Sequence, residues 1–192
     1  MKSLRDRLDI LEEDLLNEHI RISAYHDLPF AIFCYDPEEE YRLRKEAVFL
    51  KTRIENKGKE VKIISIAGLM WEGIEKTRGI NYVIDTEKKF GFKMAQTTVN
   101  NLLSKLSPLH KIVLEKMKDL NEKKDIVFLI RSGALAPSIY RMSKLLDEMH
   151  GFTMVPVILF YPGKREGETD LRFMGIGGKE GSSCYNYRVK IY

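Results

Sequence analysis

Cysteine and histidine, the residues that most often bind metals or act as nucleophiles and bases, are scarce in this sequence. The 192-residue chain has two cysteines, Cys34 and Cys184, and four histidines. The cysteines lie far apart in sequence, and no two histidines have the spacing of metal ligands. We therefore expect reduced thiols in a cytoplasmic protein, with no metal site, no cofactor and no disulfide framework.

Motifs of the common nucleotide-binding and hydrolytic folds are also missing. The glycine-rich stretch 175–183 does not have P-loop spacing, and Glu180 follows Gly178-Lys179 where a P-loop has Ser or Thr. No Gly-x-Ser-x-Gly elbow occurs anywhere in the chain. We interpret 175–183 as a hairpin loop, and the survey as a whole predicts a protein that is not an enzyme.

Long hydrophobic runs are absent as well. No apolar stretch reaches the roughly 18 residues that cross a bilayer, and the first nine residues carry charges in place of the apolar core of a signal peptide. Hydrophobic residues make up 44% of the chain and charged residues 31%, which is typical of a globular protein. Because no repeat or linker interrupts the sequence, we expect one domain over residues 1–192 and no membrane association.

Apolar runs that read as buried strands alternate with helical patterns. The expected strands cover 28–35, 61–66, 125–130, 154–160, 170–174 and 185–192. The expected helices cover 3–19 (an N-terminal amphipathic helix within 1–19), 36–56, 69–79, two or three segments within 82–122, and 131–151. This order predicts an α/β fold: a mostly parallel sheet flanked by helices, with a short antiparallel hairpin at the C-terminal edge.

Two local details follow from the same patterns. The helix over 36–56 is expected to bury Tyr41, Val48, Phe49 and Ile54. Tyr161-Pro162-Gly163 is expected to stop the strand over 154–160, because Pro and Gly usually interrupt regular structure. The last two or three strands have connections too short for a crossover helix, so they should pair antiparallel.

Polar residues gather at the predicted carboxyl ends of several strands, where open α/β sheets bind their ligands. A crevice there would contain Asp36, Arg131, Ser132, Tyr161, Lys164 and Arg165. The basic members suit a phosphate or a carboxylate. The structural alternative is that Asp36 caps a helix, Ser132 fills a turn and the basic residues are solvated.

A mildly basic charge leaves nucleic acid open as a partner. The formal net charge is +4, and lysines are frequent from Lys88 to Lys124. However, acidic residues are interspersed there, and neither arginines nor stacking aromatics alternate with the lysines as they do in many nucleic-acid-binding segments. Contact with DNA is therefore a weakly supported alternative to a solvated or protein-binding face.

Several segments together resemble one family, the BrxB proteins of bacteriophage-exclusion (BREX) antiphage systems. The most specific is the strand end Leu159-Phe-Tyr-Pro-Gly163 with the hairpin that follows it. The other matching segments are Leu4–Leu16, Phe30–Glu38, Val127–Ile130 with Gly133, Pro137–Arg141, Gly167, Leu171–Phe173 and Tyr185–Arg188.

The resemblance implies a small cytoplasmic component of an antiviral defence system that is not itself known as an enzyme. Such systems also contain an AAA-type ATPase, a DNA adenine methyltransferase and the alkaline-phosphatase-like protein PglZ.

Three hypotheses about the function of this chain remain open. The favoured one is a noncatalytic assembly or scaffold factor that binds another system protein, most plausibly PglZ. The alternatives are a nucleic-acid-binding accessory protein and a nucleotide- or phosphate-binding enzyme that uses the strand-end crevice.

Overall fold

A mostly parallel β-sheet forms the centre of the protein. The computed structural model describes residues 3–17, 22, 28–137, 139–166, 170–175, 185–186 and 189–192. The strand order is β2-β3-β4-β1-β7, and all four neighbouring pairs in it are parallel. The strands are β1 (Phe30–Tyr35), β2 (Glu60–Ser65), β3 (Asp125–Ile130), β4 (Val157–Glu166) and β7 (Lys190–Ile191). The predicted α/β class is confirmed.

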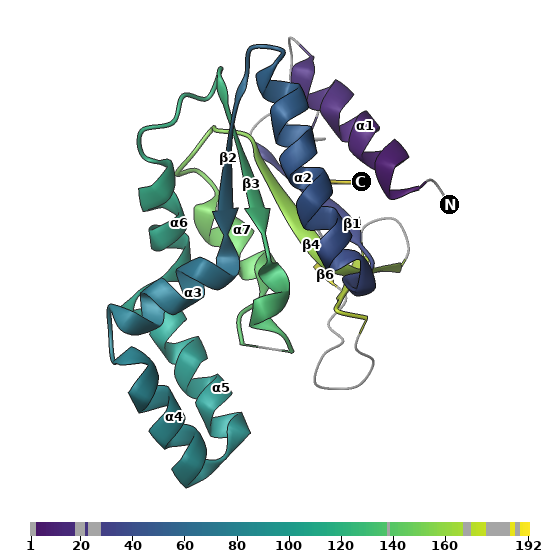
Figure 1. Ribbon diagram of the computed structural model, residues 1–192. Coiled ribbons are helices and arrows are strands. Elements are labelled where there is room, and N and C mark those ends of the chain that lie inside the picture. The colour runs from purple at the N-terminus through teal and green to yellow at the C-terminus, as the bar shows by residue number, and fades with distance from the viewer. Residues whose placement is uncertain are drawn as a thin grey trace.

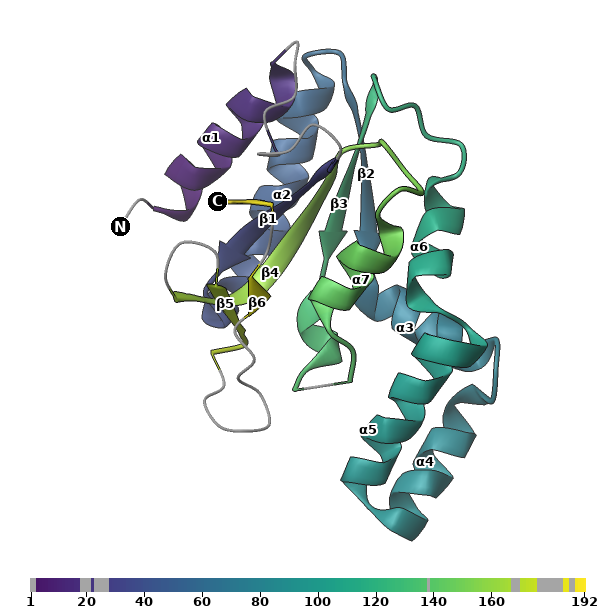
Figure 2. The same cartoon turned by 180° about the vertical axis from the view of Figure 1, so that it is seen from behind.

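Helices cover both faces of the sheet (Figures 1 and 2). On one face lie α1 (Leu4–Leu16) and α2 (Glu40–Glu55), and on the other α3 (Ile66–Glu75), α6 (Leu109–Met117) and α7 (Met142–Met149). A helical hairpin of α4 (Gly79–Phe90) and α5 (Phe92–Asn101) follows α3 and projects away from the sheet. Short helical segments are η1 (Pro37–Glu39), η2 (Leu102–Leu106, a π-helix) and η3 (Ser132–Leu135).

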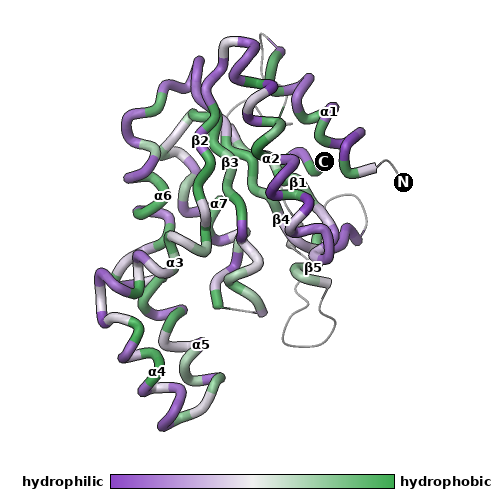
Figure 3. The backbone as a smooth tube through the Cα atoms, in the orientation of Figure 1, coloured by the Kyte–Doolittle hydropathy of each residue, from purple (hydrophilic) through white to green (hydrophobic). Residues whose placement is uncertain are grey.

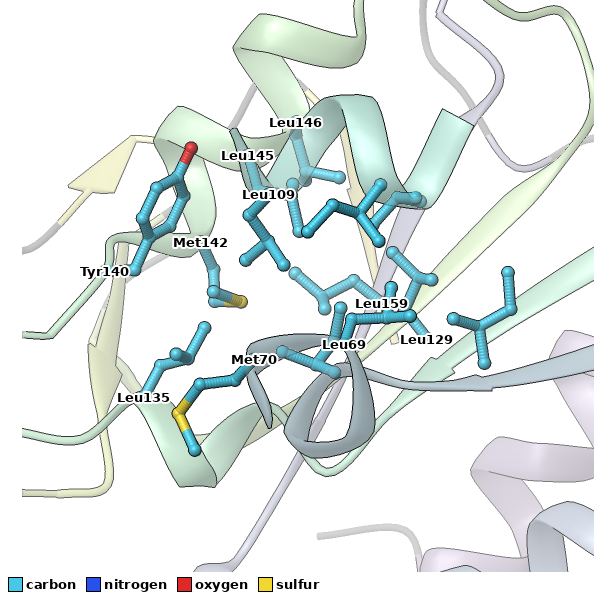
Figure 4. Close-up of a cluster of buried hydrophobic side chains, with 14 of the residues drawn as sticks. Leu69, Met70, Leu109, Leu129, Leu135, Tyr140, Met142, Leu145, Leu146 and Leu159 are labelled. Atoms are coloured by element: carbon cyan, nitrogen blue, oxygen red, sulfur yellow. The ribbon is translucent and has the colours of Figure 1, made fainter. Parts of the chain in front are cut away.

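Alternation along each strand divides the core into two layers. In β1, Ala31, Phe33 and Tyr35 pack against α1 and α2, whereas Phe30, Ile32 and Cys34 join the cluster under α3, α6 and α7. Figure 4 shows part of this second layer, where leucines of α6 and α7 meet Leu129 and Leu159 of the sheet. β1, β3 and the first part of β4 are accordingly buried along almost their whole length, and the tube in Figure 3 is largely coloured as hydrophobic along β3.

The N-terminal helix is well started but shorter than predicted. Ser3 and Asp6 form a capping box, in which the Ser3 side chain accepts from the Asp6 N–H and Asp6 accepts from the Ser3 N–H. The helix ends at Leu16 because Asn17 is extended, with φ −64° and ψ 146°. Residues 18–19 of the predicted helix, like most of the predicted loop over 175–183 and Cys184, lie outside the described residues.

The predicted buried face of α2 is wrong in three of four positions. Tyr41 and Phe49 are 76% and 60% exposed, and Val48 is exposed too. The buried residues follow the spacing 4-3-4 instead, as Leu43, Ala47, Leu50 and Ile54. This spacing keeps the four side chains on one stripe of the helix. The stripe, and not the larger aromatic side chains, therefore determines which face of α2 packs against the sheet.

Three further boundaries differ from prediction. The chain after β3 forms only the short η3 before α7, because Pro137 lacks an N–H donor and keeps Ala136 extended (φ −72°, ψ 156°). β4 does not stop at Pro162-Gly163 but continues to Glu166.

The predicted strand over 185–192 splits into two strands. β6 (Tyr185–Asn186) pairs antiparallel with β5 (Asp170–Phe173), and β7 runs parallel to β1. β7 takes this position because the outer edge of β1 offers free backbone groups, and Tyr192 N–H donates to Ile32 O over 2.9 Å.

Candidate functional site

The carboxyl ends of β1, β3 and β4 meet at one end of the sheet. β4 is the central strand of the three, and its register places Tyr161 beside Cys34 and Pro162 beside Tyr35. The six residues of the predicted crevice follow β1 or β3 or lie on β4 from Tyr161 onward, so the fold brings their backbones to the same region. Their side chains have different environments.

Ser132 is held in the interior by a hydrogen bond to the sheet. Its side chain is fully buried, and its Oγ donates to the Phe160 carbonyl oxygen over 2.9 Å. The preceding Arg131 has a left-handed backbone (φ 60°, ψ 35°), which turns the chain sharply from β3 into η3. Ser132 therefore fastens this turn to β4.

Tyr161 is likewise part of the core. It is buried, and its ring lies 5.1 Å from that of Phe173 on β5, centroid to centroid. This tilted aromatic contact fixes the start of the hairpin on β4. The arrangement gives Tyr161 a packing role at the base of the hairpin.

The chain's own β4–β5 hairpin packs beside the strand ends. From Gly163 to Glu166, β4 pairs antiparallel with β5, and Pro162 O accepts from Met174 N over 2.8 Å. A Cβ at Gly133 would lie 3.4 Å from both Pro162 Cγ and Met174 Sδ, so the hairpin packs directly on the turn after β3. The hairpin thus lies against the turn that would form one wall of the expected crevice.

Asp36, Arg131, Lys164 and Arg165 are the exposed members of the predicted set. Asp36 caps η1, and its Oδ1 accepts from Glu38 N over 3.0 Å. Lys164 is exposed, and its methylene groups pass over Gly175, 3.6–3.9 Å from the position of a Cβ there. Arg165 is exposed too, and its charge acts on the Cys34 thiol below it.

Cys34 lies beneath these charges. Burial raises the pKa of its thiol to about 11, although the positive charges of Arg7 and Arg165 act in the opposite direction. Its Sγ donates to Gly163 O over 3.4 Å. A thiol with such a pKa is almost fully protonated at neutral pH and is a poor nucleophile.

A second polar cluster, which the sequence analysis missed, ties η2 and α6 to α7. Glu148 accepts from Tyr140 Oη and lies 2.9 Å from His110 Nδ1. Lys144 Nζ lies 3.6 Å from Glu148 Oε1 and donates to Ser104 Oγ over 3.1 Å. Burial alone would raise the pKa of Glu148, but its Tyr140, Lys144 and His110 neighbours lower it overall. Only the i, i+4, i+8 spacing of 140, 144 and 148 indicates this cluster in the sequence.

Large apolar side chains remain exposed at several places, including Trp71, Tyr82, Ile84 and Leu106, and three further groups of them stand out. The first is the α2 outer face, defined as Tyr41, Val48 and Phe49. The second is the hairpin tip, defined as residues 88–94 at the junction of α4 and α5. The third is an open groove of about 700 Å³ at the opposite end of the sheet, bordered by the exposed Phe152 and Met154. The sequence signalled the second only as a lysine-rich region.

Metal-binding clusters and membrane-spanning helices are both missing from the described part of the chain. No group of three or more His, Cys, Asp or Glu side chains there is arranged to hold a metal ion. Among the same residues, no helix combines the length and apolar character that crossing a membrane requires.

The fold and these contacts define an α/β protein whose β4–β5 hairpin packs on the turn after β3. Comparison with known proteins gives the family: residues 62–191, more than half of the chain, match the family model described as "BREX protein BrxB". The chain is also 26% identical over 171 residues to a BREX protein BrxB of Bacillus cereus (strain H3081.97), covering 87% of this chain and 88% of that relative. No solved structure matches. The chain therefore belongs to the BrxB family and is a BREX component.

Proposed function

We propose that this chain is a noncatalytic assembly factor that holds another protein of its BREX system in the cytoplasm, with PglZ as the first candidate. The observation that carries the proposal is the set of exposed aromatic and apolar side chains on a molecule whose two core layers are already filled. Contiguous exposed apolar groups on a folded protein commonly mark interaction surfaces.

The predicted crevice supports the same conclusion. Ser132 and Tyr161 are engaged in internal contacts, and the β4–β5 hairpin packs on the turn after β3. A ligand that entered between the strands would have to displace this hairpin and break its backbone pairing. A protein partner that used the outer surfaces would require no such opening.

The test is capture of the tagged full-length chain from cells that express the whole operon, with mass spectrometry of what is retained. We expect one system protein to co-purify in defined stoichiometry, and PglZ to bind the chain when the two are expressed alone. A tagged chain that retains no system protein, under salt conditions that preserve folding, would contradict the proposal. Retention of a system protein other than PglZ would keep the function and replace the partner.

A nucleic-acid-binding accessory protein is the second candidate. The observation in its favour is that Lys88, Lys89 and Lys93 are exposed together at the hairpin tip. Binding of this kind would be driven by phosphate contacts and would weaken steeply as salt rises. A gel-shift titration of the full chain against duplex DNA at two salt concentrations checks this candidate.

A further inference from the structure

The α4–α5 hairpin extends beyond the rest of the molecule and buries few of its own side chains. α4 and α5 run side by side and project from the end of the sheet at which β2 and β3 finish (Figures 1 and 2). Along the two helices, Val83, Ala95 and Val99 are the buried residues. Most of the hairpin surface is therefore available for contact.

Aromatic side chains gather at the very end of this projection. α4 ends at Gly91, whose backbone is left-handed (φ 82°) and whose N–H donates to Glu87 O over 2.8 Å. On either side of Gly91, Phe90 and Phe92 are 68% and 62% exposed, and Met94 is 48% exposed. Glycine allows the sharp reversal between α4 and α5 on whose two sides these aromatic residues stand.

The apolar residues of the tip are surrounded by positive charge. Residues 87–94 contain three lysines (Lys88, Lys89 and Lys93) and one glutamate (Glu87), a net charge of 3 − 1 = +2. In the described part of the chain no ion pair is recorded for Lys88 or Lys89.

Lys93 is especially informative. It stands in the first turn of α5, a turn that has no acidic residue and no side-chain cap. A cation is unfavourable at the positive end of a helix, so the helix dipole does not favour Lys93 at this position. Lys88 and Lys89, by contrast, lie in the last turn of α4, where cations stabilise the helix.

We propose that the hairpin tip inserts Phe90 and Phe92 into an apolar groove with an acidic rim on the BREX protein that this chain holds. The inference rests on the proposed function and names the surface and the chemistry of its partner. The shape fits because a narrow convex tip can enter a groove, whereas the α2 outer face lies along the body of the molecule (Figure 1). Two identical tips would repel each other, so a partner of opposite charge is favoured over a second copy.

Two variants of the full chain and one control separate this surface from the others. Phe90→Ser with Phe92→Ser removes the aromatic anchors, and Lys88→Glu with Lys89→Glu reverses the local charge. The control, Tyr41→Ser with Phe49→Ser, removes a comparable exposed aromatic pair from the α2 outer face. Circular dichroism and thermal unfolding verify that each variant is folded, and binding to the purified system protein identified by the capture experiment is then titrated.

We expect the aromatic variant to raise the Kd by about tenfold or more, as truncation of central anchors does. Charge reversal should weaken binding most at low salt and also lower the association rate. The control should bind like the wild type. Equal binding by wild type and both tip variants, or a loss confined to the control, would overturn the inference while leaving the proposed function intact.

Each remaining outcome also decides against the inference. If no system protein binds the wild-type chain, the proposed function fails and this inference fails with it. If the tip variants keep the protein partner but lose a gel shift with duplex DNA, the tip is a nucleic-acid surface and the inference is wrong. If the aromatic variant binds normally and only charge reversal has an effect, the apolar insertion is refuted.

Discussion

Replacing Gly163 by alanine tests whether the β4–β5 hairpin is closed onto the strand ends as tightly as the geometry indicates. Gly163 stands opposite Phe173 in the ladder of β4 and β5. A Cβ at this position would lie 2.3 Å from the Arg172 carbonyl oxygen and 2.8 Å from Tyr161 Cε1. Ordinary contact begins roughly 1 Å further out. Because the closer obstacle is backbone, β5 would have to move away from β4 and weaken the ladder.

We expect a loss of about 3 kcal/mol in the free energy of unfolding, at the upper end of the range for overpacking. For a chain of this length that corresponds to a fall in Tm of roughly 6–12 °C. Urea unfolding followed by circular dichroism measures the loss. The matched control is Gly151→Ala, where φ is +79° but nothing lies within 4 Å, so only left-handed strain of about 1–2 kcal/mol applies. If Gly163→Ala is no less stable than the control, the close approach of β5 to Gly163 is wrong.

Three other outcomes follow from the same packing and charges. Phe160 lies 5.4 Å from Phe33 and 5.3 Å from Phe128 between ring centroids, so Phe160→Ala should cost about 3–5 kcal/mol in urea unfolding. Glu12 accepts from Arg53 Nε over 2.6 Å and from Lys57 Nζ over 2.9 Å. Burial alone would raise the pKa of Glu12, but these two cations lower it below 4.5 overall. Its contribution to stability is therefore present above that pH and lost as pH falls through the lowered pKa, and an acid titration of Glu12→Gln should show a shallower loss. In a Cys184→Ser background, Cys34 should react with iodoacetamide far more slowly in the folded protein than in urea, and equal rates at neutral pH would contradict its raised pKa of about 11.

The sheet could be predicted from the sequence because its strands are apolar on both faces. Continuous runs such as Ile126–Leu129 indicate burial on two sides, which implies helices on both sides and parallel pairing. The orientation of α2 could not be predicted as easily. Two stripes compete in that helix, and the buried one contains the smaller residues Leu43 and Ala47, while Tyr41 and Phe49 face outward. A prediction from side-chain size chose the wrong face of α2 as the buried one. The 4-3-4 spacing of the apolar residues indicates the correct face.

The order of strands and helices along the chain predicted that β1, β3 and β4 converge at one end of the sheet. It did not predict which residues surround that end. Pro162-Gly163 is typical of a turn, yet here it lies within a continuous strand. What decides this is a change of partner: Pro162 pairs with Tyr35 in the parallel sheet, and Gly163 already pairs with Phe173 in the hairpin. The proline needs no donor N–H at this junction, and the glycine leaves room for the Arg172 carbonyl. Such a change depends on residues distant in sequence and carries no local signal.

The candidate surfaces differ in the free energy that is needed to expose them. A surface that needs less of it binds a partner more readily. A ligand that entered beneath the hairpin would have to open the β4–β5 ladder from Gly163 to Glu166 and separate the rings of Tyr161 and Phe173. Its apparent affinity is reduced by the small fraction of molecules that are open. The hairpin tip has no such cost, because Phe90 and Phe92 are exposed in the folded chain and their helices already stand clear of the sheet. The same binding energy therefore gives a tighter complex at the tip than beneath the hairpin, and this difference favours a partner-holding role over binding of a ligand between the strands.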